Sequence, residues 1–402
     1  MWKAIEQMKV CMQEILGGPV LLALKNPTKG DFEKAICGNG WPVTDPRLED
    51  PCLQPQGVEA GVERMVLRAT LSMGIAGFPR KSRWFCPVAL DLARREERWV
   101  VVGWEWEEIP PWIHMKGNTW ASDRFTVVLP ERMAPTERSL GRMAGRIASW
   151  LNEALESLAE RLPPEIQRPR YLAVWVPQAW LYAEMAGARP TSPAATVFAL
   201  RHIREGGEIV GCASSEPIIF LNRQLILRRS RRGRVEVARH ELVHASLARW
   251  NVPWRPIWLS EGVAALYAGE RLWRELAGKD ALAIRSLAKH AMKAVFVDPF
   301  TPRQALLEMA ACSALAEFAR ERYGEGRLLS LYKAFSAVPA EVVRRHAGDR
   351  FTWARAEQIV RETAPALLQR HLGVREEEFL DAFVNWVLSR LSGARRKRPA
   401  GR

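Results

Sequence analysis

The chain has 402 residues, of which 48% are hydrophobic, so it is long enough for two or three domains and can bury ordinary cores. Its formal net charge is +14 at pH 7, from 59 lysines and arginines against 45 acidic residues. These numbers exclude an intrinsically disordered protein, and the charge raises the question of a polyanionic partner such as nucleic acid. The arginines are spread along the chain, however, as a biased genomic base composition would also produce, so charge alone does not indicate such a partner.

Six cysteines occur without a CxxC pair or a regular spacing, which argues against a zinc finger and against a disulfide framework. We expect reduced, mostly buried thiols. At the N-terminus, Glu6 and Glu14 interrupt the apolar segment that a signal peptide would need, and the apolar run 20–24 is far shorter than the ~20 residues of a membrane span. We therefore expect a cytoplasmic protein without a transmembrane segment, although a chain trimmed of its leader would look the same.

The first region, residues 1–115, is rich in tryptophan and of unknown role. Apolar residues at helical spacing predict a helix over 1–16, and the Pro-, Gly- and Asp-rich stretch 39–57 favours a loop. The stretches 83–93 and 98–109 have the composition of strands. In the second of these, one face carries apolar residues at a period of two, namely Val100, Val102, Trp104 and Trp106. That face could bind a ligand, but filling a small core is the simpler interpretation.

A second region begins after Pro110-Pro111, and we predict an α+β domain over residues 116–390. Its first half has β-branched, strand-like runs before and after one long amphipathic helical pattern. The predicted elements are a strand at 124–130, a helix at 138–161, and strands at 171–176, 208–212 and 217–221. This order is expected of a small sheet that lies against the next helix, with the last strand at the border of a cleft.

The second half of this region is helical in pattern. Apolar recurrence every three and four residues predicts helices at 305–323, 327–335, 353–372 and 376–391. Pro365 is expected to kink or split the third of these helices. The last residues, 391–402, are basic and of low complexity, which predicts a disordered tail.

The sequence His240-Glu241-Leu242-Val243-His244 lies between these two halves, in a helical apolar pattern. On a helix, residues four apart share one face, so both imidazoles could grip one metal ion. Glu241 lies about 100° around the helix from His240, where its carboxylate could reach a water at the metal without being a ligand. The pattern therefore predicts two ligands and a general base together.

A third ligand follows in Trp258-Leu259-Ser260-Glu261-Gly262. Two prolines in the stretch 251–256 end one helix and favour the start of another, and a helix–turn–helix of this length can return the Glu261 carboxylate to the imidazoles. Two imidazoles and a carboxylate leave the fourth position of a tetrahedral Zn²⁺ open, as in catalytic sites. We therefore predict one Zn²⁺ ion bound by His240, His244 and Glu261. The alternative is a pair of surface or core histidines without a metal.

The two motifs together resemble the gluzincin metallopeptidases, and within them the peptidase MA-like group, whose members combine HExxH with a downstream WLxEGxA segment, here residues 258–264. The resemblance covers residues 118–390 and does not account for 1–115. It implies a zinc-dependent metallopeptidase with a zincin-like fold that hydrolyses peptide bonds in a peptide or protein substrate. It assigns three zinc ligands, His240, His244 and Glu261. It assigns Glu241 as the general base.

Two departures from the family pattern concern groups around the metal. The position where relatives often carry a tyrosine that supports the oxyanion is Met309, and the position of an acidic partner, four residues after Glu261, is Ala265. An active enzyme would then need a donor from elsewhere, and the sequence offers Tyr267, His290 and Tyr323. Each of these also suits an ordinary packing or surface role. The departures therefore leave open a catalytically lapsed peptidase scaffold that binds a protein partner.

Five arginines crowd the stretch 228–234, directly before the histidine helix. As a loop at the mouth of a cleft they could bind acidic or carboxylate-terminated peptides, or a phosphate backbone. A solvated linker is the simpler interpretation. A basic, nucleic-acid-associated protein is the third hypothesis, carried by charge alone, and the sequence specifies neither the oligomeric state nor the cleavage specificity.

Overall fold

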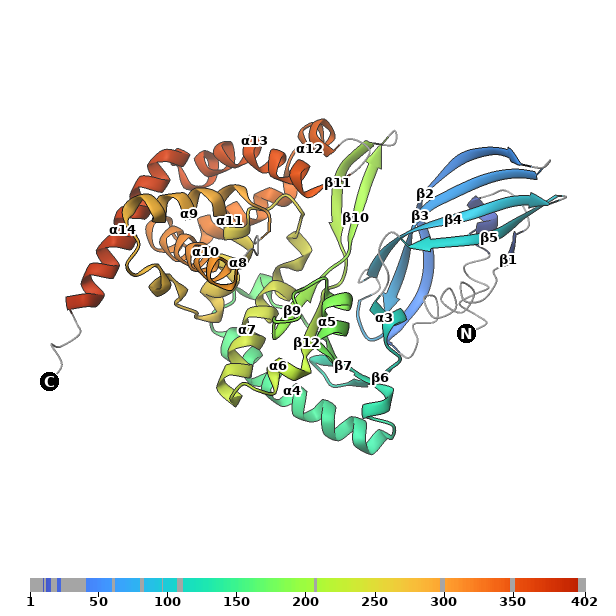
Figure 1. Cartoon of the computed structure of the whole chain (residues 1–402), viewed down its shortest axis with the longest axis horizontal. Coiled ribbons are helices and arrows are strands. Elements are labelled where there is room, and N and C mark those ends of the chain that lie inside the picture. The colour runs from blue at the N-terminus through green and yellow to red at the C-terminus, as the bar shows by residue number, and fades with distance from the viewer. Residues whose placement is uncertain are drawn as a thin grey trace. The chain divides into compact units, whose positions relative to one another are not determined.

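The computed structural model describes residues 10, 12–15, 20–22, 41–59, 62–79, 83–95, 97–106, 111–205, 208–296, 301–347 and 351–396 (Figure 1). It is a mixed α and β fold with a helical C-terminal part. The chain divides into two compact units, each built from several stretches of sequence. The first comprises residues 1–157, 165–201 and 214–249, and the second comprises 158–164, 202–213 and 250–402. Within the described part, no helix is both long enough and apolar enough to cross a membrane.

The first unit begins with a five-stranded sheet in the order β1-β5-β4-β3-β2, drawn in blue and cyan in Figure 1. Its strands are β1 (Val20–Leu22), β2 (Val43–Glu59), β3 (Val62–Ile75), β4 (Arg83–Arg95) and β5 (Arg98–Trp106). β1 pairs parallel to β5, and the other pairs are antiparallel. The two strands predicted for this region are confirmed as β4 and β5, but the side chains of Trp104 and Trp106 lie outside those described. Of the predicted helix 1–16, residues 10 and 12–15 are helical and the rest lies outside the described residues.

β2 occupies the stretch that was expected to be a loop, so that prediction is wrong. β2 is the edge strand of the sheet, and its pairing with β3 shifts register at three places, each of which contains or adjoins a proline. The shifts lie between Thr44 and Arg47, Glu49 and Cys52, and Pro55 and Gly57. Proline has no N–H to donate to a neighbouring strand, and sheets tolerate it on edge strands and at bulges. The prolines therefore mark bulges in a strand.

The second sheet of the first unit has the order β6-β7-β8-β12-β9. Its strands are β6 (Gly117–Ala121), β7 (Phe125–Pro130), β8 (Tyr171–Val176), β9 (Ala194–Val197) and β12 (Ile218–Asn222). β7, β8 and β12 are parallel, and β6 and β9 run antiparallel at the two edges. The helix α4 (Glu137–Ala159) connects β7 to β8, with 3₁₀ turns at Glu131–Met133 and Pro164–Ile166, and α5 (Ala179–Ala186) follows β8. The predicted order of strand, long helix and strand is confirmed.

Three details of the predicted sheet differ in the structure. The strand predicted at 208–212 is β11 (Glu208–Ser214), which pairs with β10 (Leu200–Glu205) in a separate two-stranded sheet. The edge neighbour of β12 is β9, whose four residues are too few to show a periodic pattern in the sequence. β12 was expected to border a cleft, but it is an interior strand and all five of its residues are buried.

One hydrophobic core joins the two sheets of the first unit. The ring centroids of Trp41 and Trp112 lie 6.2 Å apart, and Trp41 also contacts Phe220 of β12 at 6.5 Å. These tryptophans therefore fill a core. The boundary expected after residue 115 falls inside this unit, because apolar residues on both sides of it pack together.

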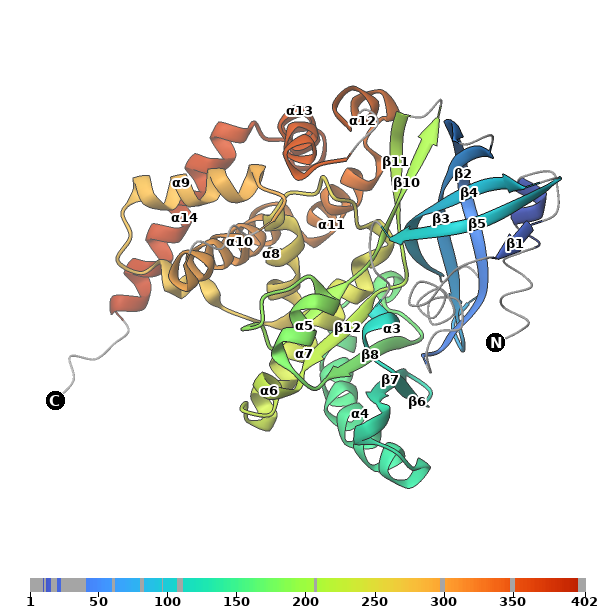
Figure 2. The same ribbon diagram turned by 45° about the vertical axis from the view of Figure 1, so that its right-hand side comes forward.

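The helices α6 (Arg223–Ile226) and α7 (Arg231–Leu247) end the first unit, and a 3₁₀ turn at Ala248–Trp250 follows. α7 begins inside the arginine-rich stretch, so the prediction of a loop over 228–234 is wrong. Ser230 is the N-cap, with its Oγ accepting a hydrogen bond from the backbone N–H of Gly233 at 3.2 Å, and arginine is a good helix former. α7 packs against β9 and β12, as Figure 2 shows for β12, in agreement with the expected sheet-on-helix arrangement.

The second unit is helical apart from the β10–β11 hairpin. Its helices are α8 (Ile257–Ala268), α9 (Ala281–Lys293), α10 (Pro302–Tyr323), α11 (Glu325–Ala334), α12 (Ala340–Ala347), α13 (Trp353–Leu372) and α14 (Glu376–Arg396), with 3₁₀ turns at Leu272–Leu276 and Phe335–Ala337. α10 packs against α8, α9, α11 and α14 and is therefore the central helix of this unit.

The four helices predicted for this half are confirmed as α10, α11, α13 and α14. α13 continues through Pro365 without splitting. A proline inside a helix removes one backbone hydrogen bond, and packing of α13 against α11 and α12 compensates for that loss. The helices α9 and α12 were not predicted. α14 extends to Arg396, so the first residues of the expected tail are helical, while residues 397–402 lie outside the described part.

Candidate metal centre

Two imidazoles face the same side of α7. His240 and His244 lie one turn apart, with their Nε2 atoms separated by 3.1 Å and their ring centroids by 4.8 Å. Both side chains are half-buried. Leu242 and Val243 are fully buried. Burial of these apolar side chains fixes the rotation of α7 about its axis, and this rotation sets the direction in which the imidazoles point.

The distance between the two imidazoles bears on what could lie between them. Two neutral nitrogen lone pairs that face each other at 3.1 Å would repel, so either one ring donates its N–H to the other or a cation lies between the rings. Two nitrogen ligands on a tetrahedral Zn²⁺, with bonds of about 2.0 Å, lie roughly 3.3 Å apart. The spacing of the two rings is therefore close to the spacing that such a metal requires.

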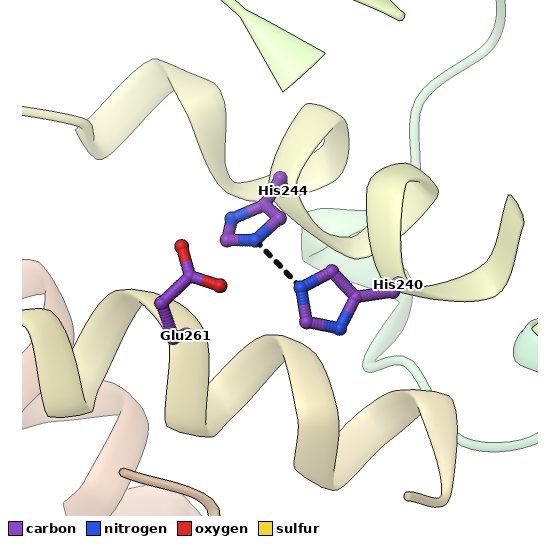
Figure 3. Close-up of side chains that lie close together, drawn as sticks. All are labelled: His240, His244 and Glu261. Carbon is purple, nitrogen blue, oxygen red and sulfur yellow. Dashed lines mark hydrogen bonds between the residues drawn. The ribbon is translucent and has the colours of Figure 1, made fainter. Parts of the chain in front are cut away.

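Glu261 supplies the carboxylate from α8. One ligand atom from each of His240, His244 and Glu261 can be chosen so that all three lie within 4.8 Å of one another, and Figure 3 shows the three side chains directed toward one another. Glu261 is half-buried, as the histidines are. In the described ranges this is the one cluster of three His, Cys, Asp or Glu residues with such a spacing. The three residues predicted as ligands are thus a group that could hold a metal ion.

The packing of α8 explains the glycine that follows Glu261. A Cβ atom placed on Gly262 would lie 2.2 Å from the carbonyl oxygen of Cys312 in α10 and 2.8 Å from its carbonyl carbon. Both are backbone atoms, which cannot rotate away. Gly262 therefore allows α8 to approach α10 closely, and this contact holds the turn of helix that carries Glu261.

Cys312 is close to Glu261, but its chemistry does not suit a metal ligand. The side chain is fully buried. Burial raises the pKa of the Cys312 thiol well above its ordinary value, and the carboxylates of Glu261 and Glu308 raise it further. The thiolate is the form that binds metals, so a thiol that stays protonated is a poor ligand.

Glu241 is 8% exposed and has a hydrogen-bond donor on the neighbouring sheet. The hydroxyl of Thr196 on β9 lies 2.8 Å from Glu241 Oε2 and 2.9 Å from the Glu241 backbone oxygen. Tyr182 of α5 is fully buried, and burial raises the pKa of its hydroxyl, with a further rise from the Glu241 carboxylate. No pattern in the sequence pointed to Thr196 or Tyr182, because both come near Glu241 only through the folding of the sheet.

The C-terminal end of α7 is anchored to the same sheet. The hydroxyls of Tyr171 on β8 and Ser246 on α7 lie 2.9 Å apart, and both groups are buried. The guanidinium of Arg168 contacts the Glu216 carboxylate and donates to the carbonyl oxygen of Ala245 at 3.4 Å. These contacts hold the C-terminal end of α7 in place.

The three residues considered as oxyanion donors have local partners. Tyr267 donates a hydrogen bond to Glu325 at 2.6 Å. The ring of Tyr323 stacks on Phe379 with centroids 5.9 Å apart. His290 lies near the end of α9 with about half of its side chain exposed, and its Nε2 is 4.0 Å from Oε1 of Glu308. Packing and surface roles therefore account for these three side chains.

The arginines before the histidines make local contacts. Arg231 donates to Glu153 of α4 at 2.9 Å, and Arg232 pairs with Glu236 one turn further along α7. Arg231, Arg232 and Arg239 line an open groove of about 480 Å³ with Glu153, Ser157 and Val235. A role for this stretch in binding acidic peptides or nucleic acid stays a prediction.

Comparisons with known proteins gave one distant structural match. No protein-family model matches the chain, and no match was found among the curated proteins. One solved structure that it resembles is a mutant M1 zinc metallopeptidase from Deinococcus radiodurans bound to a Tyr-Ser-Ala substrate. The identity is 14% and the TM-score 0.28, and the match covers 86% of this chain and 64% of that one, which is less than two thirds of its length. A likeness at this level establishes neither a family nor an activity.

Proposed function

We propose that this protein is a zinc-dependent metallopeptidase of the gluzincin type, whose metal-binding and catalytic residues lie within residues 116–390. The observation that carries the proposal is the convergence of His240, His244 and Glu261, with Glu241 next to the first histidine. Structural zinc sites use four protein ligands, whereas catalytic sites use three and keep one position open. Three half-buried ligands are also what access for water and substrate requires.

The donor set fits zinc. Two imidazole nitrogens and one carboxylate oxygen suit Zn²⁺ and related transition metals, whereas Ca²⁺ and Mg²⁺ prefer oxygen ligands throughout. When bound, one Zn²⁺ ion would lower the pKa of a coordinated water toward 7 and polarise the peptide carbonyl. The residues that would hold the ion are His240, His244 and Glu261.

Glu241 is the general base in this proposal. Its carboxylate takes a proton from the attacking water, whose oxygen bonds to the carbonyl carbon of the substrate. The carbon–nitrogen bond then breaks, and Glu241 returns the proton to the leaving amine. The low exposure of Glu241 supports this role, because a carboxylate that is largely removed from bulk water does not lose the transferred proton to solvent before the amine leaves.

β9 provides a place for the substrate backbone. It is an edge strand of the second sheet and packs against α7, which carries the histidines. An edge strand presents backbone N–H and C=O groups to which an extended peptide can add as a further strand. This feature favours a peptide or protein substrate over a nucleic acid.

The test combines a zinc measurement with a cleavage assay on a mixed peptide library, using the full-length protein. Glu241→Gln should keep its zinc and lose turnover by about 10²–10⁴-fold, because the amide cannot accept the proton. His244→Ala should lose the zinc itself, whereas His346→Ala, in the surface helix α12, should keep it. Undiminished cleavage by Glu241→Gln, or unchanged zinc in His244→Ala by elemental analysis, would contradict the proposal.

A catalytically lapsed, protein-binding scaffold is the second candidate, and specific observations favour it. Tyr267 is bound to Glu325 and Tyr323 is packed against an aromatic ring, while Met309 and Ala265 offer no polar hydrogen to an oxyanion. A wild-type protein that binds zinc with the expected ligands and cleaves no peptide of the library would support this candidate over an active enzyme.

A further inference from the structure

Thr196 makes a two-point contact with Glu241. Its Oγ1 lies 2.8 Å from Oε2 of the carboxylate and 2.9 Å from the backbone carbonyl oxygen of the same residue. The contact joins the edge strand β9 to the helix that carries the histidines. It therefore ties one oxygen of the Glu241 side chain to a fixed point on the sheet.

The surroundings of Thr196 make it a rigid support. β9 pairs with β12, and Thr196 stands opposite Ile219, which is fully buried. Threonine is branched at Cβ, so its χ1 angle has few allowed values and its hydroxyl points in a defined direction. α7 packs on β9, so the strand and the helix hold the two partners at a constant separation.

The chemistry of a carboxylate gives this contact a consequence. A threonine hydroxyl has one hydrogen to donate, and here both nearby acceptors belong to Glu241. With Oε2 held by that hydroxyl, the side chain cannot rotate freely about its last bond, and the other oxygen, Oε1, has a fixed direction. Proton transfer needs a donor and an acceptor within about 3 Å and in line, so the direction of Oε1 decides whether the base can work.

We propose that Thr196 is a positioning residue for the general base, which reserves Oε2 and leaves Oε1 as the oxygen that exchanges the proton with water. This inference rests on the proposed peptidase function. Thr196 acts through Glu241, so its loss should affect the chemical step and leave substrate binding and the metal in place.

Thr196→Val is the decisive variant, because it keeps the branched shape and removes the hydroxyl. We expect kcat to fall about 10–100-fold, the range that follows from a misplaced catalytic group, with KM and zinc content unchanged. Thr196→Ser restores the hydroxyl and should recover most of the lost kcat. Thr126→Val on β7 is the matched control, because Thr126 is buried and its hydroxyl has no hydrogen-bond partner in the described structure. The kcat of this variant should stay at the wild-type value.

A crystallographic comparison of the zinc-loaded wild type, Thr196→Val and Thr196→Ser separates this inference from the peptidase proposal, because it needs no turnover. The Glu241 carboxylate should keep the wild-type orientation in Thr196→Ser and adopt a different one, or several, in Thr196→Val. An unchanged orientation in Thr196→Val, or an unchanged kcat, overturns the inference. A wild type that binds zinc and cleaves nothing overturns the peptidase proposal instead, and the carboxylate orientations still decide whether Thr196 positions Glu241.

Discussion

His114, in the short helix α3 (Pro111–His114), connects the stability of this protein to pH through one side chain. Its side chain is 13% exposed, and its Nδ1 lies 3.4 Å from Oε1 of Glu184. Burial lowers the pKa of His114 below its ordinary value of 6.5, although the Glu184 carboxylate opposes the shift. The folded protein therefore favours the neutral imidazole. A histidine of this kind stabilises the fold above pH 6.5, and that stability is lost as the pH falls from 6.5 toward the folded-state pKa.

Replacing His114 with glutamine should remove this dependence. Between pH 7.5 and pH 5, the free energy of unfolding of the wild type should fall more than that of His114→Gln, because the His114 imidazole takes up a proton more readily in the unfolded chain than in the folded protein and glutamine does not titrate. Urea denaturation at a series of pH values measures both curves. Parallel curves over this range would show that His114 does not contribute.

At the scale of secondary-structure elements, Gly262 sets how closely α8 approaches α10. Gly262→Ala forces α8 away from the backbone of α10, and overpacking of this kind costs about 1–3 kcal/mol. Since Glu261 is the preceding residue, we also expect weaker zinc binding in competition with a chelator. Gly141→Ala in α4 is the matched control: nothing lies within 4 Å of its added Cβ, so the substitution should leave stability unchanged or raise it by up to about 1 kcal/mol. Wild-type stability and zinc affinity in Gly262→Ala would refute the packing argument.

The elements that could be predicted from the sequence are those with local patterns. α13 was predicted with its observed bounds, and β8 and the two motif helices were placed correctly, because apolar periodicity and caps are local signals. β2 was not predicted, because its prolines are compatible with a strand only at the edge of a sheet, and the sequence does not show which strand is at the edge. Three predicted ligands lie together, but Thr196 could not be anticipated, because its contact with Glu241 depends on pairing between β9 and β12.

At the scale of the whole molecule, the shared core of the first unit makes residues 1–115 necessary for the part that bears the histidines. Six buried apolar residues of the second sheet belong to this core: Val128, Leu172, Val174, Val176, Ile218 and Phe220. Exposing each of them would cost roughly 1.5–3 kcal/mol, so the cost for all six, roughly 9–18 kcal/mol, is comparable to the roughly 5–15 kcal/mol by which a typical domain is stable.

A chain that begins at residue 116 should therefore fail to fold cooperatively. Near-UV circular dichroism and thermal unfolding of the fragment 116–402 provide the measurement, and co-expression with a separate chain of residues 1–115 is the control, because it restores the missing half of the core. A fragment with a sharp unfolding transition of its own would show that the first region is dispensable for folding.

The path of the chain between its two units has a further consequence, for how such a protein can be altered by recombination. The chain passes from one unit to the other after residues 157, 164, 201, 213 and 249. No continuous stretch of the gene encodes either unit alone: residues 1–249 hold all of the first unit, but also two segments of the second. A crossover within residues 1–249 would divide the first unit, and one after residue 157 would divide the second, so neither unit can be exchanged as a single cassette without segments of the other.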